Sequence, residues 1–389
     1  MQMMNGVSSS NLGWRGVRQL VAALETLCLV AAGCGGQSGT DNAASPTGAS
    51  NGGASNDTAA SSSTQTTSSS ADAGKPITIA YSDWPGWVVW DVVQQKGFFN
   101  KYGVNVKMVW FPVYTDSLNA LSAGQVDANC QTWSDTMAPL AQGVDLKTVL
   151  VNDNSFGNDS LIAQPGITSL QQLKGKKVAT ELGTVDHFLL LKALEAQGMT
   201  EKDIQFTNIK VQDCPTAMLS KNVDAAVVWE PSRTKILSSM KGTKEIYTSR
   251  QLPGQIPDLL VAKGDLVKNR PGDVQKIVDA WYDALDYIRK NPAESIKIMA
   301  ARTSTPVADY QSFVKGTRLF SSSEDVTAMT KNSNPISLYS TGDGIAKFLI
   351  QAEQVTKMPN WAASIEPQFV EAANKKGLGK QPPFDYPKS

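Results

Sequence analysis

The stretch Leu121-Ser-Ala-Gly-Gln-Val-Asp-Ala128, followed by Trp133, recurs as Leu219-Ser-Lys-Asn-Val-Asp-Ala225, followed by Trp229. Both stretches run from a helical pattern through a polar turn into a short apolar strand. Chance could repeat the Val-Asp-Ala triplet. It is much less able to repeat the triplet, the preceding helix and the following tryptophan together. The repeat therefore predicts that the chain contains two halves of similar construction.

Working outward from the repeat, each half predicts the order strand, helix, strand, helix, strand. This order is typical of a parallel, doubly wound sheet with helices on its faces. The five predicted segments of the first half are 76–81, 87–95, 104–111, 115–122 and 126–132. Those of the second half are 177–180, 184–197, 204–211, 215–220 and 223–228.

Two further segments predict crossings between the halves. Residues 149–162 indicate a strand, an Asn/Asp-rich loop and a second strand, and 256–262 indicate a strand that returns to the first half. The loop lacks the glycine and terminal glutamate of an EF-hand, so we interpret it as a solvated hinge. The sequence after residue 274 is mostly helical in pattern. We expect an α/β clamshell with lobe 1 at 76–155 plus 256–389 and lobe 2 at 156–255.

The N-terminal region predicts export and a tether. Residues 1–33 have a basic start, a short apolar stretch and small residues before Cys34, which is typical of a lipoprotein signal peptide with Cys34 as the lipidated residue. Residues 34–75 are rich in Ser, Thr, Gly and Ala and predict a disordered linker. We therefore expect the protein outside the cytoplasm, on the periplasmic side of the cell membrane, held there by a lipid anchor.

Composition excludes several classes of protein. Lys+Arg and Asp+Glu both number 36, so the formal net charge is zero and does not favour a nucleic-acid partner. One histidine and four cysteines make a structural zinc site or a disulfide-dense scaffold a poor fit. We expect no cofactor and no metal, and free, buried thiols at Cys130 and Cys214. No nucleophile–base pair or phosphate loop accompanies His187, which predicts a binding protein, not an enzyme.

Candidate ligand-binding residues follow the carboxyl ends of the predicted strands, where open parallel sheets bind their ligands. They are aromatic or acidic, and no arginine occurs from residue 19 to residue 232. The candidates are Asp83, Trp84, Trp87, Tyr114, Trp133, Asp135, Glu181, Asp186, Trp229, Glu230 and Asp258. The alternative for Asp83 and Asp186 is helix capping, and the tryptophans could also be core residues.

The sign of these side chains favours a cationic ligand. A carboxylate about 4 Å from a bound anion would cost about 4 kcal/mol at an effective dielectric constant near 20. Carboxylates accept paired N–H donors from a planar cation, and indole faces attract positive charge. A small nitrogen-rich cation such as guanidinium is therefore the ligand that the residues favour.

Several motifs resemble those of substrate-binding proteins of bacterial ABC importers, in the nitrate/sulfonate/taurine/bicarbonate family. They are Gly97-Phe98-Phe99 with Tyr102-Gly103-Val104, 121–128, 173–179 and 223–231. The resemblance implies a periplasmic-binding-protein-like fold and a monomer that delivers a small molecule to a membrane permease with a separate ATPase.

The resemblance leaves the ligand open. Members that resemble nitrate, sulfonate or taurine receptors bind anions, and a bicarbonate receptor would use calcium. Other proteins of this fold family resemble synthases of the thiamin pyrimidine, in which His187 would take part with a pyridoxal cofactor. These readings remain alternatives to the cation receptor.

Overall fold

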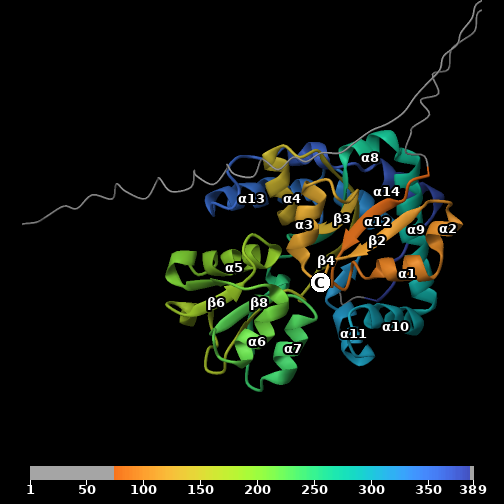
Figure 1. Cartoon of the computed structure of the whole chain (residues 1–389). Coiled ribbons are helices and arrows are strands. Elements are labelled where there is room, and N and C mark those ends of the chain that lie inside the picture. Colours follow the sequence, from red (N-terminus) through yellow and green to blue (C-terminus); the bar gives the residue numbers. More distant parts are fainter. Residues whose placement is uncertain (1–73, 386–389) are drawn as a thin grey trace, which may run out of the picture. The chain divides into compact units, whose positions relative to one another are not determined.

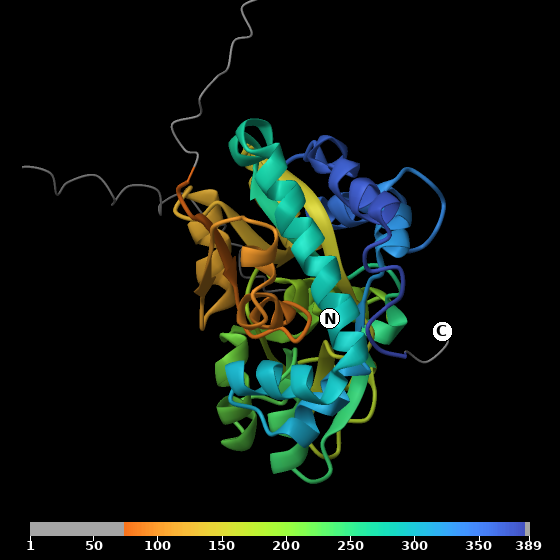
Figure 2. The ribbon, with the colours of Figure 1, turned by 90° about the vertical axis from the view of Figure 1, so that its right-hand side faces the viewer.

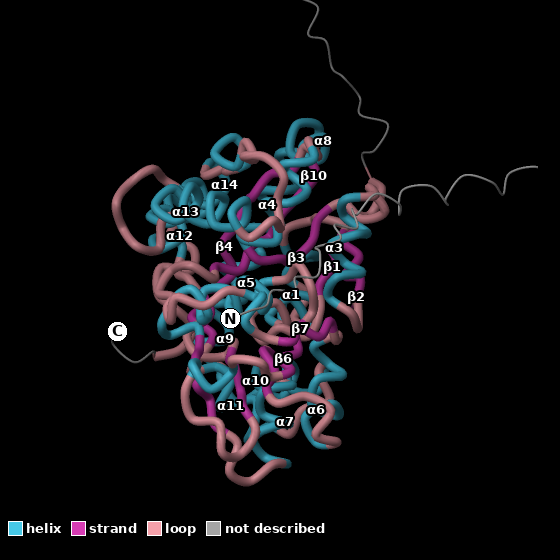
Figure 3. Tube along the Cα trace, turned by 90° about the vertical axis from the view of Figure 1, so that its left-hand side faces the viewer, coloured by secondary structure: helices cyan, strands magenta, loops and turns pink. Residues whose placement is uncertain are grey.

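The computed structural model describes residues 74–385. The predicted signal peptide, Cys34 and all but the last two residues of the predicted linker lie outside the described residues. Two β-sheets, each covered by helices, form the described part of the chain (Figure 1). The strands fall into two separate groups along the Cα trace (Figure 3).

The first sheet has the strand order β11-β4-β10-β3-β1-β2 within the described residues. Its strands are β1 (Ile77–Tyr81), β2 (Val106–Trp110), β3 (Ala128–Thr132), β4 (Leu146–Ser155), β10 (Pro257–Lys263) and β11 (Thr317–Leu319). Strand β1 pairs in parallel with β2 and β3, whereas β10 pairs antiparallel with β3 and β4. The sheet is therefore mixed, with a parallel part that matches the predicted first half.

The second sheet repeats this arrangement in the order β7-β6-β8-β5-β9. Its strands are β5 (Ser160–Ala163), β6 (Lys177–Thr180), β7 (Gln205–Asn208), β8 (Ala225–Val228) and β9 (Lys244–Thr248). Strand β6 pairs in parallel with β7 and β8, and β5 pairs antiparallel with β8. The prediction of two similar halves is thus confirmed by strand pairing.

The aspartates of the repeated triplet have the same structural role in both halves. Asp127 Oδ2 accepts hydrogen bonds from the Thr78 backbone N–H at 2.9 Å and from Thr78 Oγ1 at 2.8 Å. Asp224 Oδ2 accepts one from the Lys177 backbone N–H at 2.8 Å. Each aspartate therefore joins the start of the central strand to the turn before a neighbouring strand, which is why both halves keep it.

Helices cover both sheets and form most of the C-terminal region. Those of the two repeated halves are α1 (Val89–Gln95), α2 (Phe98–Lys101), α3 (Tyr114–Ser122), α4 (Trp133–Gln142), α5 (Val185–Glu195), α6 (Cys214–Leu219) and α7 (Ser232–Ser239). The later ones are α8 (Gly264–Asn269), α9 (Pro271–Lys290), α10 (Pro292–Arg302), α11 (Val307–Val314), α12 (Ser322–Met329), α13 (Leu338–Gln351) and α14 (Gln368–Lys376). The long helix α9 runs alongside the first sheet (Figure 2).

The chain passes between the sheets where the sequence predicts crossings. The segment between β4 and β5 leaves the first sheet for the second, and the segment between β9 and β10 returns. One part of this prediction is wrong: the Asn/Asp-rich run is not a solvated loop, because Asp153, Asn154 and Asp159 are all buried. The residue bounds of the two lobes remain a prediction.

Three other features concern the described residues alone. Cys130 and Cys214 are buried and free, as expected from the sequence. No group of three or more His, Cys, Asp or Glu side chains between residues 74 and 385 is arranged to hold a metal ion. Within the same range, no helix has the length and apolar character needed to cross a membrane.

Candidate functional site

A small cavity lies where strand ends of the two sheets meet. It is lined by Trp84, Trp87, Tyr114, Thr132, Asp159, Val185, Trp229, Ile256 and Asp258. Its volume, measured with a water-sized sphere, is about 10 Å³, which is roughly the room that one water molecule needs. The cavity lies where ligands of open parallel sheets bind, at strand ends. The side chains that line the cavity are closely packed.

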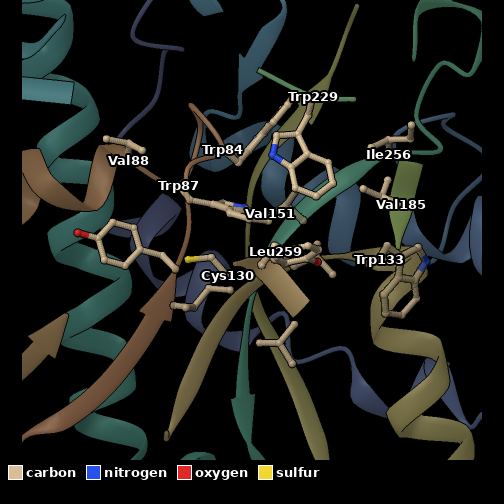
Figure 4. Close-up of a cluster of buried hydrophobic side chains, with 14 of the residues drawn as sticks. Trp84, Trp87, Val88, Cys130, Trp133, Val151, Val185, Trp229, Ile256 and Leu259 are labelled. Atoms are coloured by element: carbon tan, nitrogen blue, oxygen red, sulfur yellow. The ribbon is translucent and has the colours of Figure 1, made fainter. Parts of the chain in front are cut away.

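Aromatic rings form one wall of the cavity. The Trp87 and Tyr114 ring centroids are 5.1 Å apart, and the Tyr114 and Trp229 centroids are 5.6 Å apart with the rings nearly perpendicular. Trp229 faces Trp84 and Trp87 across the cluster, whereas Trp133 stands apart from them (Figure 4). Four of the five predicted aromatic residues therefore line the cavity.

Trp133 packs elsewhere, although the repeat places it in the position equivalent to Trp229. Its ring meets the edge of Trp361, which belongs to the short 3-10 helix at Trp361–Ser364, at a centroid distance of 6.1 Å. It is fully buried and does not line the cavity. The structure therefore places Trp133 in the core of the first half.

Two hydrogen bonds join the two sides of the site. Trp229 Nε1, after β8, donates to Asp83 Oδ1, after β1, at 3.1 Å. Thr115 Oγ1, on α3, donates to Glu181 Oε1, after β6, at 2.6 Å. Burial raises the pKa of Asp83 to about 6, against the opposing effect of the bond from Trp229. Residues from both sheets therefore make the site jointly.

Two carboxyl groups from neighbouring strands meet beside the cavity. Asp153 on β4 and Asp258 on β10 are register partners, and both are buried. Trp84 Nε1 donates to the two oxygens of Asp153 at 3.0 and 3.2 Å. Burial, and then the negative charge of Asp153, raise the pKa of Asp258 well above its usual value. The pKa of Asp153 is also raised, chiefly by burial.

A second carboxyl pair lies nearby and comes from different elements. Asp159 follows β4 and accepts a hydrogen bond from Ser155 Oγ, while Asp186 lies in the first turn of α5. Neither oxygen of Asp186 has a hydrogen-bond partner. Burial, and then the charge of Asp159, raise the pKa of Asp186 well above its usual value, and burial raises that of Asp159.

The other predicted acids surround the cavity without lining it. Asp135 accepts hydrogen bonds from Tyr114 Oη at 2.8 Å and Ser134 Oγ at 3.1 Å, and burial raises its pKa to about 6. Glu181 has one oxygen without a partner. Glu230 accepts a hydrogen bond from Arg233 Nη1 at 2.8 Å. Burial raises the pKa of both glutamates.

Helix capping does not account for Asp83 and Asp186. The helix α1, which follows Asp83, and the helix α5, in whose first turn Asp186 lies, both begin without a side-chain cap. Asp83 instead receives the Trp229 indole N–H, and Asp186 faces Asp159. Five of the predicted residues thus line the cavity: Trp84, Trp87, Tyr114, Trp229 and Asp258. Five others lie around it without lining it: Asp83, Asp135, Glu181, Asp186 and Glu230.

Asp153 and Asp159 were missed in the sequence because the Asn/Asp run looks like a solvent-exposed loop. The signal that could have found them is their place in a segment that crosses between the halves beside a strand end. His187, in contrast, lies outside the cavity lining: its Nδ1 accepts from the Gly183 N–H at 3.2 Å and its Nε2 donates to Glu201 Oε2 at 2.6 Å. Both ring nitrogens are occupied by structural contacts.

Relatives among known proteins are of two kinds. A protein of Brucella abortus named as a binding protein is 27% identical over 262 residues, covering 67% of this chain and 81% of its own length. A 4-amino-5-hydroxymethyl-2-methylpyrimidine phosphate synthase of Uromyces fabae is 24% identical over 310 residues, covering 75% of this chain and 87% of its own length.

The solved structure of the periplasmic aliphatic sulphonate binding protein SsuA from Escherichia coli has the same fold. Its TM-score is 0.63 at 22% identity, and the match covers 75% of this chain and 92% of that one. This likeness confirms the predicted periplasmic-binding-protein-like fold. The family described as NMT1/THI5 like matches residues 91–295, which is more than half of the chain. The protein therefore belongs to the NMT1/THI5-like family.

Proposed function

We propose that the protein is the extracytoplasmic solute-binding component of an ABC importer, and that it binds a small nitrogen-containing cation, guanidinium first among those to test. The ligand would lie between the strand ends of the two sheets and be delivered to a membrane permease with its ATPase. The observation that carries the proposal is the set of buried carboxyls around an aromatic cavity, with no lysine or arginine among the residues that line it.

The charge of the site supports a cation in preference to an anion. Asp159 and Asp258 line the cavity, and Asp153 and Asp186 lie directly against them. An anion could bind there only if these carboxyls kept their protons and donated them as hydrogen bonds. Anion affinity would then fall as the pH rises, whereas cation affinity would rise.

The size of the cavity supports a small ligand. Because about 10 Å³ is open to a water-sized sphere, any ligand of several atoms requires the surrounding side chains to move apart. The bonds from Trp229 to Asp83 and from Thr115 to Glu181 join the two sides. We propose that these contacts break and re-form as the ligand enters and leaves.

The tether is part of the same proposal. Cys34 would carry lipid after removal of residues 1–33, and residues 34–75 would link it to lobe 1 (76–155 plus 256–389) and lobe 2 (156–255). Growth of the producing cells with a labelled fatty acid tests this. Label on the wild type and none on Cys34→Ala supports the anchor, and equal label on both contradicts it.

A second candidate is an anion receptor, which the name of the E. coli sulphonate-binding structure favours. A third is an enzyme of the pyrimidine synthase type, favoured by the U. fabae relative. The occupied ring nitrogens of His187 do not support a catalytic role for that side chain.

Isothermal titration of the purified protein separates these candidates. Guanidinium chloride, at concentrations far below those that denature proteins, is compared with sodium nitrate, taurine, and sodium bicarbonate with calcium. We expect saturable binding of guanidinium alone. Tight binding of taurine or nitrate without guanidinium binding would contradict the cation and support an anion receptor, and binding of pyridoxal phosphate would support the enzyme.

A further inference from the structure

Besides Glu181 Oε2, three carboxyl oxygens of buried aspartates beside the cavity accept no hydrogen bond from an N–H or hydroxyl group of the described residues. They are both oxygens of Asp186 and Oδ2 of Asp258. Asp186 is 0% exposed and Asp258 is 2% exposed. A buried acceptor without a donor costs free energy. Asp258 itself lines the cavity, so a molecule that enters there can supply the missing donor.

The groups packed around these oxygens do not supply a compensating charge. Burial, and after it the negative charges of Asp153, Asp159 and Asp135, raise the pKa of Asp258. Burial, and after it the negative charges of Asp159, Asp135 and Glu181, raise the pKa of Asp186. Arg233, which donates to the site residue Glu230, also donates to Glu245.

Like charges held this close cannot all be ionised, so protons must remain on some members of the cluster. In Asp153–Asp258 and Asp159–Asp186, a proton on one carboxyl lets it donate to the other. Such a proton also marks the place that an N–H group of a ligand can take. Each pair therefore has two ways to be satisfied: by a proton, or by a cation that carries N–H donors.

On the basis of the proposed function, we infer that the pairs Asp153–Asp258 and Asp159–Asp186 exchange protons for the N–H donors of the ligand. This exchange restricts the site to cations that carry N–H donors. In the exchange, a carboxyl O–H bond breaks and its proton passes to solvent, and the carboxylate formed accepts an N–H hydrogen bond from the cation. No electrons are transferred.

The aromatic wall alone would bind cations with N–H groups and cations without them, but the carboxyl pairs should bind only the first kind tightly. Tetramethylammonium carries a positive charge that indole faces attract, but it has no N–H group and leaves the carboxylate oxygens unpartnered. Hydrogen bonds to charged groups contribute enough that losing one or two weakens binding about 10- to 100-fold. Guanidinium should therefore bind at least that much more tightly.

Titration calorimetry with guanidinium chloride and with tetramethylammonium chloride, at pH 7 in phosphate and in Tris, tests the inference. These buffers differ in ionisation enthalpy, so the difference in heat gives the number of protons released. We expect release of about one proton or more with guanidinium, and an affinity for tetramethylammonium lower by about 10-fold or more.

Matched variants show which carboxyls release the protons when guanidinium binds. Asp186→Asn should release fewer protons on binding guanidinium, and Asp159→Asn gives the same test from the other member of the pair. Asp145→Asn, at a carboxylate whose side chain is 73% exposed, should behave as the wild type.

The outcomes distinguish this inference from the function on which it rests. If guanidinium binds without proton release, or tetramethylammonium binds equally well, the inference is overturned and the receptor for a cation stands. If neither cation binds and taurine does, both the proposed ligand and the inference are overturned.

Discussion

Two aspartates, Asp91 in α1 and Asp186 in α5, are equally buried but differ in the hydrogen-bond donors around their carboxylates. Asp91 is 1% exposed, and its carboxylate accepts hydrogen bonds from Arg302 Nε at 2.7 Å and Tyr81 Oη at 2.9 Å. Asp186 is 0% exposed and has no donor at either oxygen. Burial alone therefore does not identify a functional carboxylate.

What differs is where the missing donors come from. The partners of Asp91 belong to the same chain, so the carboxylate holds α1 against α10 and β1 whether or not a ligand is present. Asp258 lines the cavity and Asp186 lies beside it, and neither Oδ2 of Asp258 nor the two oxygens of Asp186 receive such a donor from the described residues. We infer that the first kind of carboxylate stabilises the fold. The second kind lowers the stability of the ligand-free protein and, under the proposed function, gains its hydrogen-bond donors from the ligand.

The largest expected effect comes from removing the paired carboxylate. Asp91→Ala leaves the Arg302 guanidinium and the Tyr81 hydroxyl without their acceptor, which should lower the free energy of unfolding by about 3 kcal/mol. Urea denaturation measures this loss without adding guanidinium. The affinity of the folded variant for guanidinium should stay within about twofold of the wild type, since Asp91 does not line the cavity. A large loss of affinity with unchanged stability would reverse the comparison.

Replacing a carboxyl that lacks a donor should raise the free energy of unfolding, whereas Asp91→Ala should lower it. Asp258→Asn replaces a buried carboxyl, whose ionisation burial and the charge of Asp153 disfavour, by a neutral amide that can donate to Asp153. The free energy of unfolding at pH 8, without ligand, should rise by about 1 kcal/mol, the order of magnitude of the hydrogen bond that the amide can donate to Asp153. Urea unfolding at pH 8 and pH 5 checks this, with a smaller gain expected at pH 5. A loss of stability similar to that of Asp91→Ala would show that Asp258 is structural.

The wild type should lose stability as the pH rises. Burial raises the pKa of Asp83 and of Asp135 from 3.8 to about 6. Between about pH 4 and pH 6 the folded protein therefore binds more protons than the unfolded chain, so the free energy of unfolding falls with rising pH. The further carboxyls with raised pKa values continue the fall at higher pH. A rise of about 2 in pKa corresponds to a loss of about 3 kcal/mol for each such group, so we expect a total loss of roughly 3 kcal/mol or more.

Calorimetric melting at pH 5, 6.5 and 8, without ligand, measures this trend. A melting temperature that rises steadily over the range would mean that the site carboxyls gain donors on folding, as Asp91 does.

The smallest effect concerns the two tryptophans that the repeat makes equivalent. Trp229→Phe keeps an aromatic ring at the cavity but removes the N–H donor of Asp83, which should weaken guanidinium binding about 3- to 10-fold. Trp133→Phe is the matched control: Trp133 Nε1 has no partner, and the ring does not line the cavity. Equal losses of affinity in the two variants would contradict the assignment of Trp229 to the binding site and of Trp133 to the core.

Much of the fold could be predicted because local patterns and the repeat agreed. Apolar strands followed by amphipathic helices predicted β1 to β3 and β6 to β8 within a few residues. Strands β9 and β11 were missed, since both are short edge strands whose pairing depends on distant segments. The antiparallel position of β10 follows from the chain's return to the first sheet and not from its own composition.

The candidate site was predictable only in part. Trp84 and Trp229 directly follow strands, and parallel topology brings such positions together. The burial of Asp153 and Asp159 depends on the packing of the crossing segment between both sheets, which the polar sequence does not indicate. Trp133 could not be separated from Trp229 by pattern, because its partner Trp361 lies far away in the sequence.

A crystal structure grown with guanidinium and taurine both present tests the central claim most directly. The account predicts guanidinium in the cavity, with its nitrogen atoms within hydrogen-bonding distance of Asp159 and Asp258 and an indole of the aromatic wall over its plane. Taurine in the cavity, with its sulfonate on backbone N–H groups and these two carboxyls turned away, would contradict it.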